Sequence, residues 1–151
     1  MVAARARKLV DSPPPVDSCC QMGANEHALR YATERLQFGK PIGGFQLAQD
    51  LLVRMLGNVV RSQTMCPRMS QPQDEGRMTE EIAGLAKALC SVRCRETVGW
   101  ARELLGGNGI RLENHVGRFV ADAEAIYSYE GAREMNTLIV GEHITGLSAF
   151  V

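Results

Sequence analysis

The chain has few aromatic residues and no excess of charge of either sign. Phe, Trp and Tyr make up 5% of its 151 residues, and 17 Lys and Arg balance 17 Asp and Glu. A neutral balance provides no electrostatic field that would draw in nucleic acid or an anionic membrane surface, so neither is an expected partner. No apolar run approaches the length of about 18 residues that a membrane-spanning helix needs.

Disulfide and metal-binding patterns are also missing. The five cysteines are irregularly spaced and odd in number, which favours a reducing, intracellular compartment. Cys90 and Cys94 lie four residues apart, but a zinc site needs two further ligands, and the histidines lack metal-ligand spacing. We interpret both cysteines as small buried residues and expect no metal site.

The composition that remains is typical of a soluble, helical domain. Hydrophobic residues account for 45% and charged residues for 23%, and Ala, Leu, Val and Met are plentiful. Low aromatic content over long periodic stretches favours helices over sheets. We therefore predict one all-α domain, an antiparallel four-helix-type bundle with short loops.

The chain divides into a tail and a helical domain. Residues 1–22 contain Pro13-Pro14-Pro15 and are expected to be a poorly ordered tail, while residues 23–151 form the domain. Asn25 is a candidate N-cap of the first helix, which Gly39 and Pro41 end. Periodicity predicts a second helix over residues 45–69, which Pro67 ends, and a third over residues 79–105, which Thr79 caps. Two further helical elements are predicted over residues 116–125 and 133–147.

A glycine cluster, Gly106-Gly107-Asn108-Gly109, follows the third of these segments. Glycines let a backbone approach a phosphate closely, but the known phosphate loops follow a strand rather than a long helix. The alternative is a helix C-cap followed by a tight turn.

Two other stretches have chemically useful groups. Glu130 stands between Tyr129 and Gly131. Apolar surroundings would raise its pKa and let it act as a general base. Alternatively, Glu130 is an acid in the first turn of a helix, where it opposes the helix dipole. Arg35 could hold a phosphate through its planar fork of donors, with Gln46 facing the same space. The alternative has Arg35 at a helix C-terminus, Phe38 filling the core and Gln46 in solvent.

Taken in chain order, these stretches resemble a single family. The matching motifs cover about residues 23–150 and are similar to the C-terminal helical domain of the acyl-CoA dehydrogenases: Arg35-x-Gln37-Phe38-Gly39-x-Pro41, Phe45-Gln46, Leu104-Leu105-Gly106-Gly107-Asn108-Gly109 and Tyr129-Glu130-Gly131. Residues 102–110 and 144–150 are most similar to the glutaryl-CoA dehydrogenase branch, which includes the short-chain acyl-CoA oxidases of plants.

The resemblance implies an FAD-dependent oxidoreductase that converts an acyl-CoA thioester, glutaryl-CoA or a short-chain acyl-CoA, to a 2-enoyl-CoA. Glu130 would take the α-proton as catalytic base while a hydride leaves the β carbon for the flavin, and Gly131 would touch the substrate. The implied FAD contacts are Arg35 and Gln46, reached across a subunit interface, and Glu103, Leu104, Leu105, Gly106, Gly107, Ala132, Arg133, Glu134 and Phe150.

The sequence also departs from the family. Ala132 stands where many members have Thr, and Glu103 where many have Gln. The family's N-terminal helical domain and middle β-domain are not found here, so we expect the chain alone to bind FAD weakly or not at all and to be inactive. The alternative is a non-catalytic helical oligomerisation module derived from the same family, and a third interpretation, an unrelated helical adaptor, requires the ordered matches to be accidental.

The resemblance further implies a homo-oligomer, a tetramer in the family, with electron-transfer flavoprotein or oxygen as electron acceptor. The end Ala149-Phe150-Val151 lacks the peroxisomal tripeptide, which favours a mitochondrial matrix or bacterial cytoplasm over a peroxisome. The catalytic interpretation requires Glu130 to lie near the Arg35–Gln46 corner and the glycine bend. A Glu130 side chain in bulk water, remote from both, would leave only a packing module.

Overall fold

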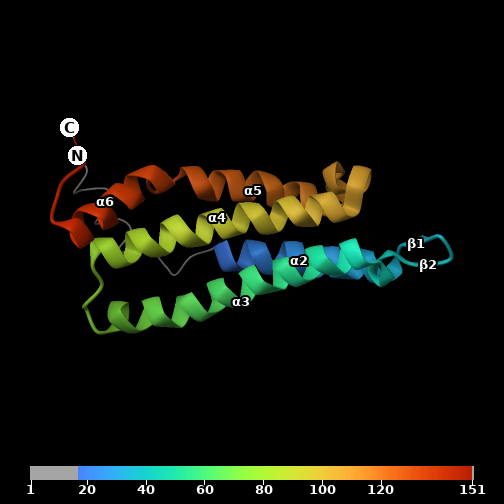
Figure 1. Ribbon diagram of the computed structural model, residues 1–151, viewed down its shortest axis with the longest axis horizontal. Helices are drawn as coiled ribbons and strands as arrows, with labels where there is room; N and C mark the ends of the chain where they lie inside the picture. The colour runs from blue at the N-terminus through green and yellow to red at the C-terminus, as the bar shows by residue number, and fades with distance from the viewer. Residues whose placement is uncertain (1–16, 151) are drawn as a thin grey trace.

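The computed structural model describes residues 17–150, which form an antiparallel bundle of long helices (Figure 1). The α5 and α6 helices follow one another along the same side of α4, so the two together complete a four-helix arrangement. The predicted all-α bundle is confirmed. Its helices are α2 (Asp17–Glu34), α3 (Gln46–Asp74), α4 (Glu80–Leu105), α5 (Val116–Ser128) and α6 (Arg133–Thr145).

Short elements close the ends of the bundle. A hairpin of β1 (Leu36–Gln37) and β2 (Lys40–Pro41) projects from one end, with a two-residue turn in which Phe38 and Gly39 both have positive φ, at 52° and 79°. Positive φ at both central positions is the geometry that suits the twist of paired strands. Short 3₁₀ elements complete the connections: η1 (Ile42–Gly44), η2 (Gly106–Ile110) and η3 (Leu112–Asn114).

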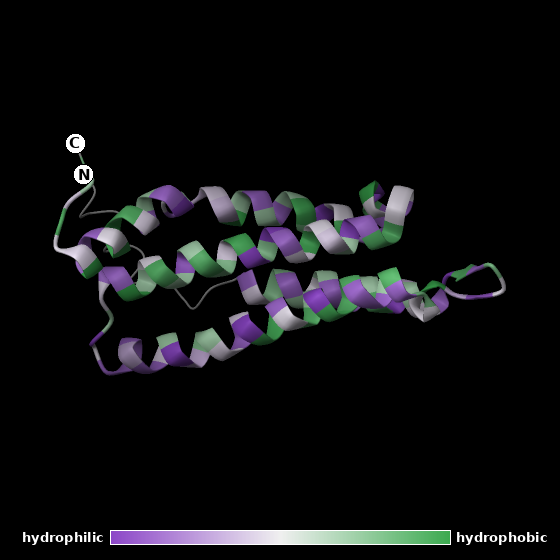
Figure 2. Cartoon of the chain, in the orientation of Figure 1, coloured by the Kyte–Doolittle hydropathy of each residue, from purple (hydrophilic) through white to green (hydrophobic). Residues whose placement is uncertain are grey.

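The core forms around α4, which packs against α2, α3, α5 and α6. Small side chains on α4 let its neighbours approach closely, and Cys90 and Cys94 are buried among them, as predicted. Hydrophilic and hydrophobic residues alternate along the helices, as expected for elements that bury one face (Figure 2). The main apolar cluster combines residues from α2 to α5: Cys20, Ala24, Ala28, Met55, Cys94, Val98, Ala101, Leu105, Val116, Ala123 and Ile126.

The start of the first helix was predicted wrongly. The α2 helix begins at Asp17, so residues 17–22 are helical, and Asn25 lies inside the helix rather than at its N-cap. Tertiary contacts explain the difference: Cys20 joins the apolar cluster, and the buried Gln21 Nε2 donates to Ser62 Oγ on α3 at 2.9 Å. The rest of the predicted tail, residues 1–16, lies outside the described residues.

The ends of other helices also differ from the prediction. The α3 helix continues through Pro67 and Pro72 to Asp74, although each proline lacks the N–H that a helix interior uses. Beyond Pro67, the buried Met69 side chain attaches this last part of α3 to the bundle. The α4 helix starts after Thr79 as predicted, but no side-chain capping bond forms there.

No helix within residues 17–150 has the length and apolar character needed to cross a bilayer.

Candidate functional site

The hairpin end of the bundle brings together residues that are far apart in the sequence. Asn108 Nδ2 in η2 donates to the Tyr31 hydroxyl of α2 at 2.7 Å, and the Arg35 backbone N–H donates to the Tyr31 carbonyl at 2.9 Å. Gln46 begins α3 just after the hairpin. The Arg35–Gln46 corner and the glycine bend (residues 106–109) therefore share one end of the bundle (Figure 1).

The glycine bend contains two kinds of glycine. Gly106 is the C-cap of α4, with φ of 58°, so the C-cap interpretation is confirmed. A Cβ added to Gly106 or Gly107 would meet no atom within 4 Å, whereas a Cβ on Gly109 would lie 2.4 Å from the Arg102 carbonyl oxygen. Gly109 is thus required for packing, while Gly106 and Gly107 leave open backbone that a ligand can approach.

Arg35 and Gln46 are available for a ligand at this end. Both side chains are exposed, and within residues 17–150 neither makes a hydrogen bond or an ion pair. A guanidinium fork, an amide and open backbone at one end suit a ligand with a diphosphate group. The alternative in which Phe38 fills the core is wrong: its ring is 92% exposed and stands edge-on to Phe45, with centroids 6.1 Å apart.

The turn between α5 and α6, residues 129–131, is an unusual backbone segment that we call the Glu130 turn. Glu130 has φ of 55° and Gly131 has φ of 89°. A left-handed conformation costs a non-glycine residue about 1–2 kcal/mol, so neighbouring contacts must hold it in place. Asn136, at 1% exposure, donates from Nδ2 to the carbonyls of Gly131 at 2.9 Å and Ala132 at 3.3 Å.

The Glu130 side chain itself is exposed, which corrects two expectations. No apolar surround is provided by the described residues, and Glu130 precedes α6 rather than standing in its first turn, where Glu134 lies. Tyr129 packs at the level of Lys87 on α4, and the glycine bend begins after Leu105. At 1.5 Å per residue these levels are roughly 27 Å apart, so one chain does not bring Glu130 to the hairpin end. Within a single chain, the arrangement that the catalytic interpretation required is therefore not present.

The remaining predicted cofactor residues divide between the two places. Glu103, Leu104 and Leu105 end α4 beside the glycine bend, where Glu103 is exposed and Leu105 is buried. Ala132, Arg133 and Glu134 follow the Glu130 turn, and the Arg133 guanidinium pairs with Glu134 at 3.0 Å. Phe150 lies half-buried beyond the end of α6, where its backbone N–H donates to Ser148 Oγ at 3.3 Å.

Two buried ionisable side chains near the Glu130 turn, Lys87 and Asp17, were not recognised from the sequence. Lys87 is 8% exposed and Asp17 is 2% exposed, and Asp17 Oδ2 has no hydrogen-bond partner among the described residues. Burial raises the pKa of Asp17 to about 6, with the Lys87 charge opposing that rise. A signal for Lys87 existed: it falls between Ala83 and Cys90 on the buried stripe of α4.

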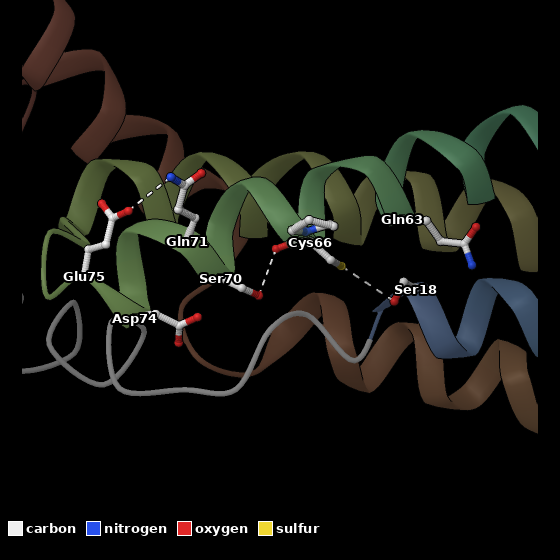
Figure 3. A pocket seen from close by; sticks show the side chains of 8 residues that line it. Ser18, Gln63, Cys66, Ser70, Gln71, Asp74 and Glu75 are labelled. Carbon is white, nitrogen blue, oxygen red and sulfur yellow. Dashed lines mark hydrogen bonds between the residues drawn. The ribbon is translucent and has the colours of Figure 1, made fainter.

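A polar groove of about 750 Å³ between the start of α2 and the second half of α3 was also not anticipated (Figure 3). Cys66 Sγ donates to Ser18 Oγ at 3.8 Å across it, and Asp74 and Glu75 lie at its far end. None of the residues predicted to act on substrate or cofactor lines it.

Within residues 17–150, no three His, Cys, Asp or Glu side chains gather as metal ligands.

Comparison with known proteins matches this architecture to one family. The family model described as the C-terminal domain of acyl-CoA dehydrogenase matches residues 21–145. A glutaryl-CoA dehydrogenase of Desulfococcus multivorans is 32% identical over 114 residues, which cover 75% of this chain and 29% of that protein.

Solved structures agree with the sequence comparison. A glutaryl-CoA dehydrogenase from Mycobacterium smegmatis is 35% identical, with a TM-score of 0.86 over 89% of this chain and 35% of the other. A second structure from that organism, 27% identical with the same TM-score and coverage, is a complex with FADH2. The chain therefore spans about a third of the length of these relatives.

Proposed function

The chain belongs to the acyl-CoA dehydrogenase family, as a C-terminal domain of that family, and from this premise we propose that it supplies the catalytic base and part of the FAD contacts of an acyl-CoA-oxidising enzyme. The observation that carries the proposal is the Glu130 turn. Two successive left-handed residues, clamped by Asn136, project a carboxylate away from the bundle. Strained backbone of this kind is concentrated at functional sites.

In the proposed reaction, Glu130 removes the α-proton of an acyl-CoA thioester. That proton is weakly acidic, so the base must be held close to it and shielded from water, which the exposed turn achieves only when covered by another part of the enzyme. Bound FAD supplies the acceptor for the hydride from the β carbon. Gly131, directly after the base, offers substrate a surface without a side chain.

The cofactor contacts form two half-sites on each chain. The first comprises Arg35 and Gln46 with the stretch 103–107, at the hairpin end; the second comprises Ala132, Arg133 and Glu134 beside the base. Since these half-sites lie roughly 27 Å apart along α4, a complete FAD site combines the hairpin end of one copy with the Glu130 turn of another. The proposal therefore includes a homo-oligomer, a tetramer by analogy with the family, and Phe150 as a contact near the chain end.

The substrate that we propose is glutaryl-CoA or a short-chain acyl-CoA, because the glutaryl-CoA dehydrogenases above are 32% and 35% identical to the chain. Electron-transfer flavoprotein or oxygen would reoxidise the cofactor. Because the chain spans about a third of its relatives' length, we expect the 151 residues alone to have no turnover. A specific observation favours the alternative of a non-catalytic module: in one chain, the Glu130 side chain is exposed and far from the hairpin end.

The test is a chimera in which residues 21–145 replace the matching part of the Mycobacterium smegmatis glutaryl-CoA dehydrogenase. We expect the purified chimera to contain FAD and to oxidise glutaryl-CoA, and Glu130→Gln to abolish turnover while the flavin absorbance remains. Equal turnover with Gln at position 130 would refute the base assignment. A chimera that folds as an oligomer without flavin would favour the non-catalytic module.

A further inference from the structure

Lys87 is the buried cation of α4, and its burial calls for an explanation. A lysine at 8% exposure has left water, and an ammonium group in a protein interior is costly unless it is paired and hydrogen-bonded. Its neighbours on α4 are small or apolar, so the partners must come from other helices.

The first partner is a free carbonyl at the end of α5. Helix geometry would pair the Ile126 carbonyl with the N–H of Glu130, but α5 stops at Ser128 and Glu130 is left-handed. The Lys87 ammonium donates to the Ile126 carbonyl instead. A cation at this place also complements the negative end of the α5 dipole.

The second partner is the turn itself. Lys87 Nζ lies 4.6 Å from the centroid of the Tyr129 ring, a distance at which a cation is attracted by the ring face. Asp17 of α2 provides a further, buried negative charge that acts on Lys87. Burial lowers the pKa of Lys87, and the charges of Asp17 and Glu130 oppose that change, so both favour the ammonium form.

We propose that Lys87 is a positioning residue for the Glu130 turn: its ammonium group joins α4 to the end of α5 and to the Tyr129 ring, and so fixes the backbone that carries the Glu130 carboxylate. Lys87 holds the α5 side of the turn, as Asn136 holds the α6 side. The importance of this position for catalysis rests on the proposed function of Glu130, whereas the contact itself does not.

The test uses the 151-residue chain without flavin or substrate. Lys87→Met keeps an unbranched side chain and removes the donor and the charge, while Lys87→Arg keeps both. Arg93→Met is the matched control, because Arg93 is also a cation of α4 but forms its ion pair with Glu96 on the same helix, at 2.7 Å, rather than with α5 or the Glu130 turn.

The measurements are amide NMR shifts and hydrogen exchange of the Tyr129 N–H, which donates to the Ala125 carbonyl at 3.0 Å. We expect Lys87→Met to speed this exchange at least tenfold relative to core amides of α4 and to shift the Glu130 and Gly131 signals. Lys87→Arg should restore both, and Arg93→Met should change neither. A folded Lys87→Met chain with exchange within twofold of the parent would overturn the proposal.

A second measurement covers a Lys87→Met chain that fails to fold. In the unsubstituted chain, nuclear Overhauser contacts should join the Lys87 Cε protons to the Tyr129 ring protons, and their absence would also overturn the proposal. Failure of the base assignment is a separate result, seen only as retained turnover of the Glu130→Gln chimera, and it leaves these measurements interpretable.

Discussion

Asn108 and Tyr31, 77 residues apart in the sequence, are joined by a 2.7 Å hydrogen bond from the Asn108 amide to the Tyr31 hydroxyl. The bond connects the glycine bend to the last turns of α2, which lead directly into Arg35. It therefore sets how the two parts of the proposed hairpin-end half-site lie relative to one another.

We expect Tyr31→Phe to lower the free energy of unfolding by about 1 kcal/mol, because the Asn108 amide loses its partner in a partly buried place. Urea denaturation followed by circular dichroism measures this change. In the FAD-containing chimera the same substitution should weaken flavin retention. Unchanged stability together with unchanged flavin content would show that the bond has no role in arranging the two segments.

The stability of the fold should depend on substitution at Gly109 but not at Gly107. Gly109→Ala places a Cβ 2.4 Å from the Arg102 carbonyl oxygen, which is backbone and cannot move aside, so we expect a loss of about 1–3 kcal/mol in unfolding free energy. Gly107→Ala meets no atom within 4 Å and is the matched control, with a change within about 0.5 kcal/mol. Equal losses for both variants in urea denaturation would contradict the packing role of Gly109.

Asp17 should make stability fall as pH rises through the acidic range. Its pKa is raised by burial from the ordinary value of 3.8 to about 6, so between these values the unfolded chain has lost a proton that the folded chain keeps. The free energy of unfolding therefore decreases from about pH 4 to pH 6, by roughly 2–3 kcal/mol in total, and the penalty is complete above pH 6.

The check compares Asp17→Asn with the parent at pH 4.5 and pH 7.0 by urea denaturation. The amide introduced by Asp17→Asn cannot ionise, so the variant should lose less unfolding free energy than the parent when the pH rises from 4.5 to 7.0. Contributions from other groups are common to both chains and cancel in the comparison. An identical difference at both pH values would mean that Asp17 ionises normally in the fold.

His27 should titrate below its ordinary range. Burial lowers the pKa of His27. The Arg30 guanidinium, 2.7 Å from Nδ1, and the His115 ring, tilted against the His27 ring with centroids 4.7 Å apart, lower the pKa further. We expect Arg30→Met to raise the pKa of His27, because a cation no longer opposes protonation. An imidazole NMR titration measures the change. Arg54→Met is the charge-matched control, because Arg54 lies on a different helix, α3, and pairs there with Asp50. A His27 titration insensitive to Arg30→Met would contradict the contact.

Several features of the fold were predictable because they depend on nearby residues. The starts of α4 after Thr79 and of α6 at Arg133 follow from apolar periodicity, and the C-cap of α4 follows from the preference for glycine at Gly106. The ordered motifs likewise predicted the family, which the match to residues 21–145 confirms. The roles of Glu130 and the cofactor residues stay predictions.

Other features depend on packing that a local pattern does not contain. Residues 17–22 are helical because Cys20 and Gln21 have distant partners on other helices, and α3 passes Pro67 because Met69 is buried beyond it. The exposure of Phe38 follows from a hairpin turn that directs its ring away from the bundle.

By itself, the sequence determined that the chain is a series of helices and placed the ends of α4, since apolar periodicity and end signals act within about one helical turn. Only the tertiary structure decided that Lys87 and Asp17 are both buried, with Lys87 against the Tyr129 ring, and that the Glu130 turn lies far along α4 from the hairpin. The physical reason is that α4 is a rigid rod: the partners packed along its length set their separation, whatever their order in the chain.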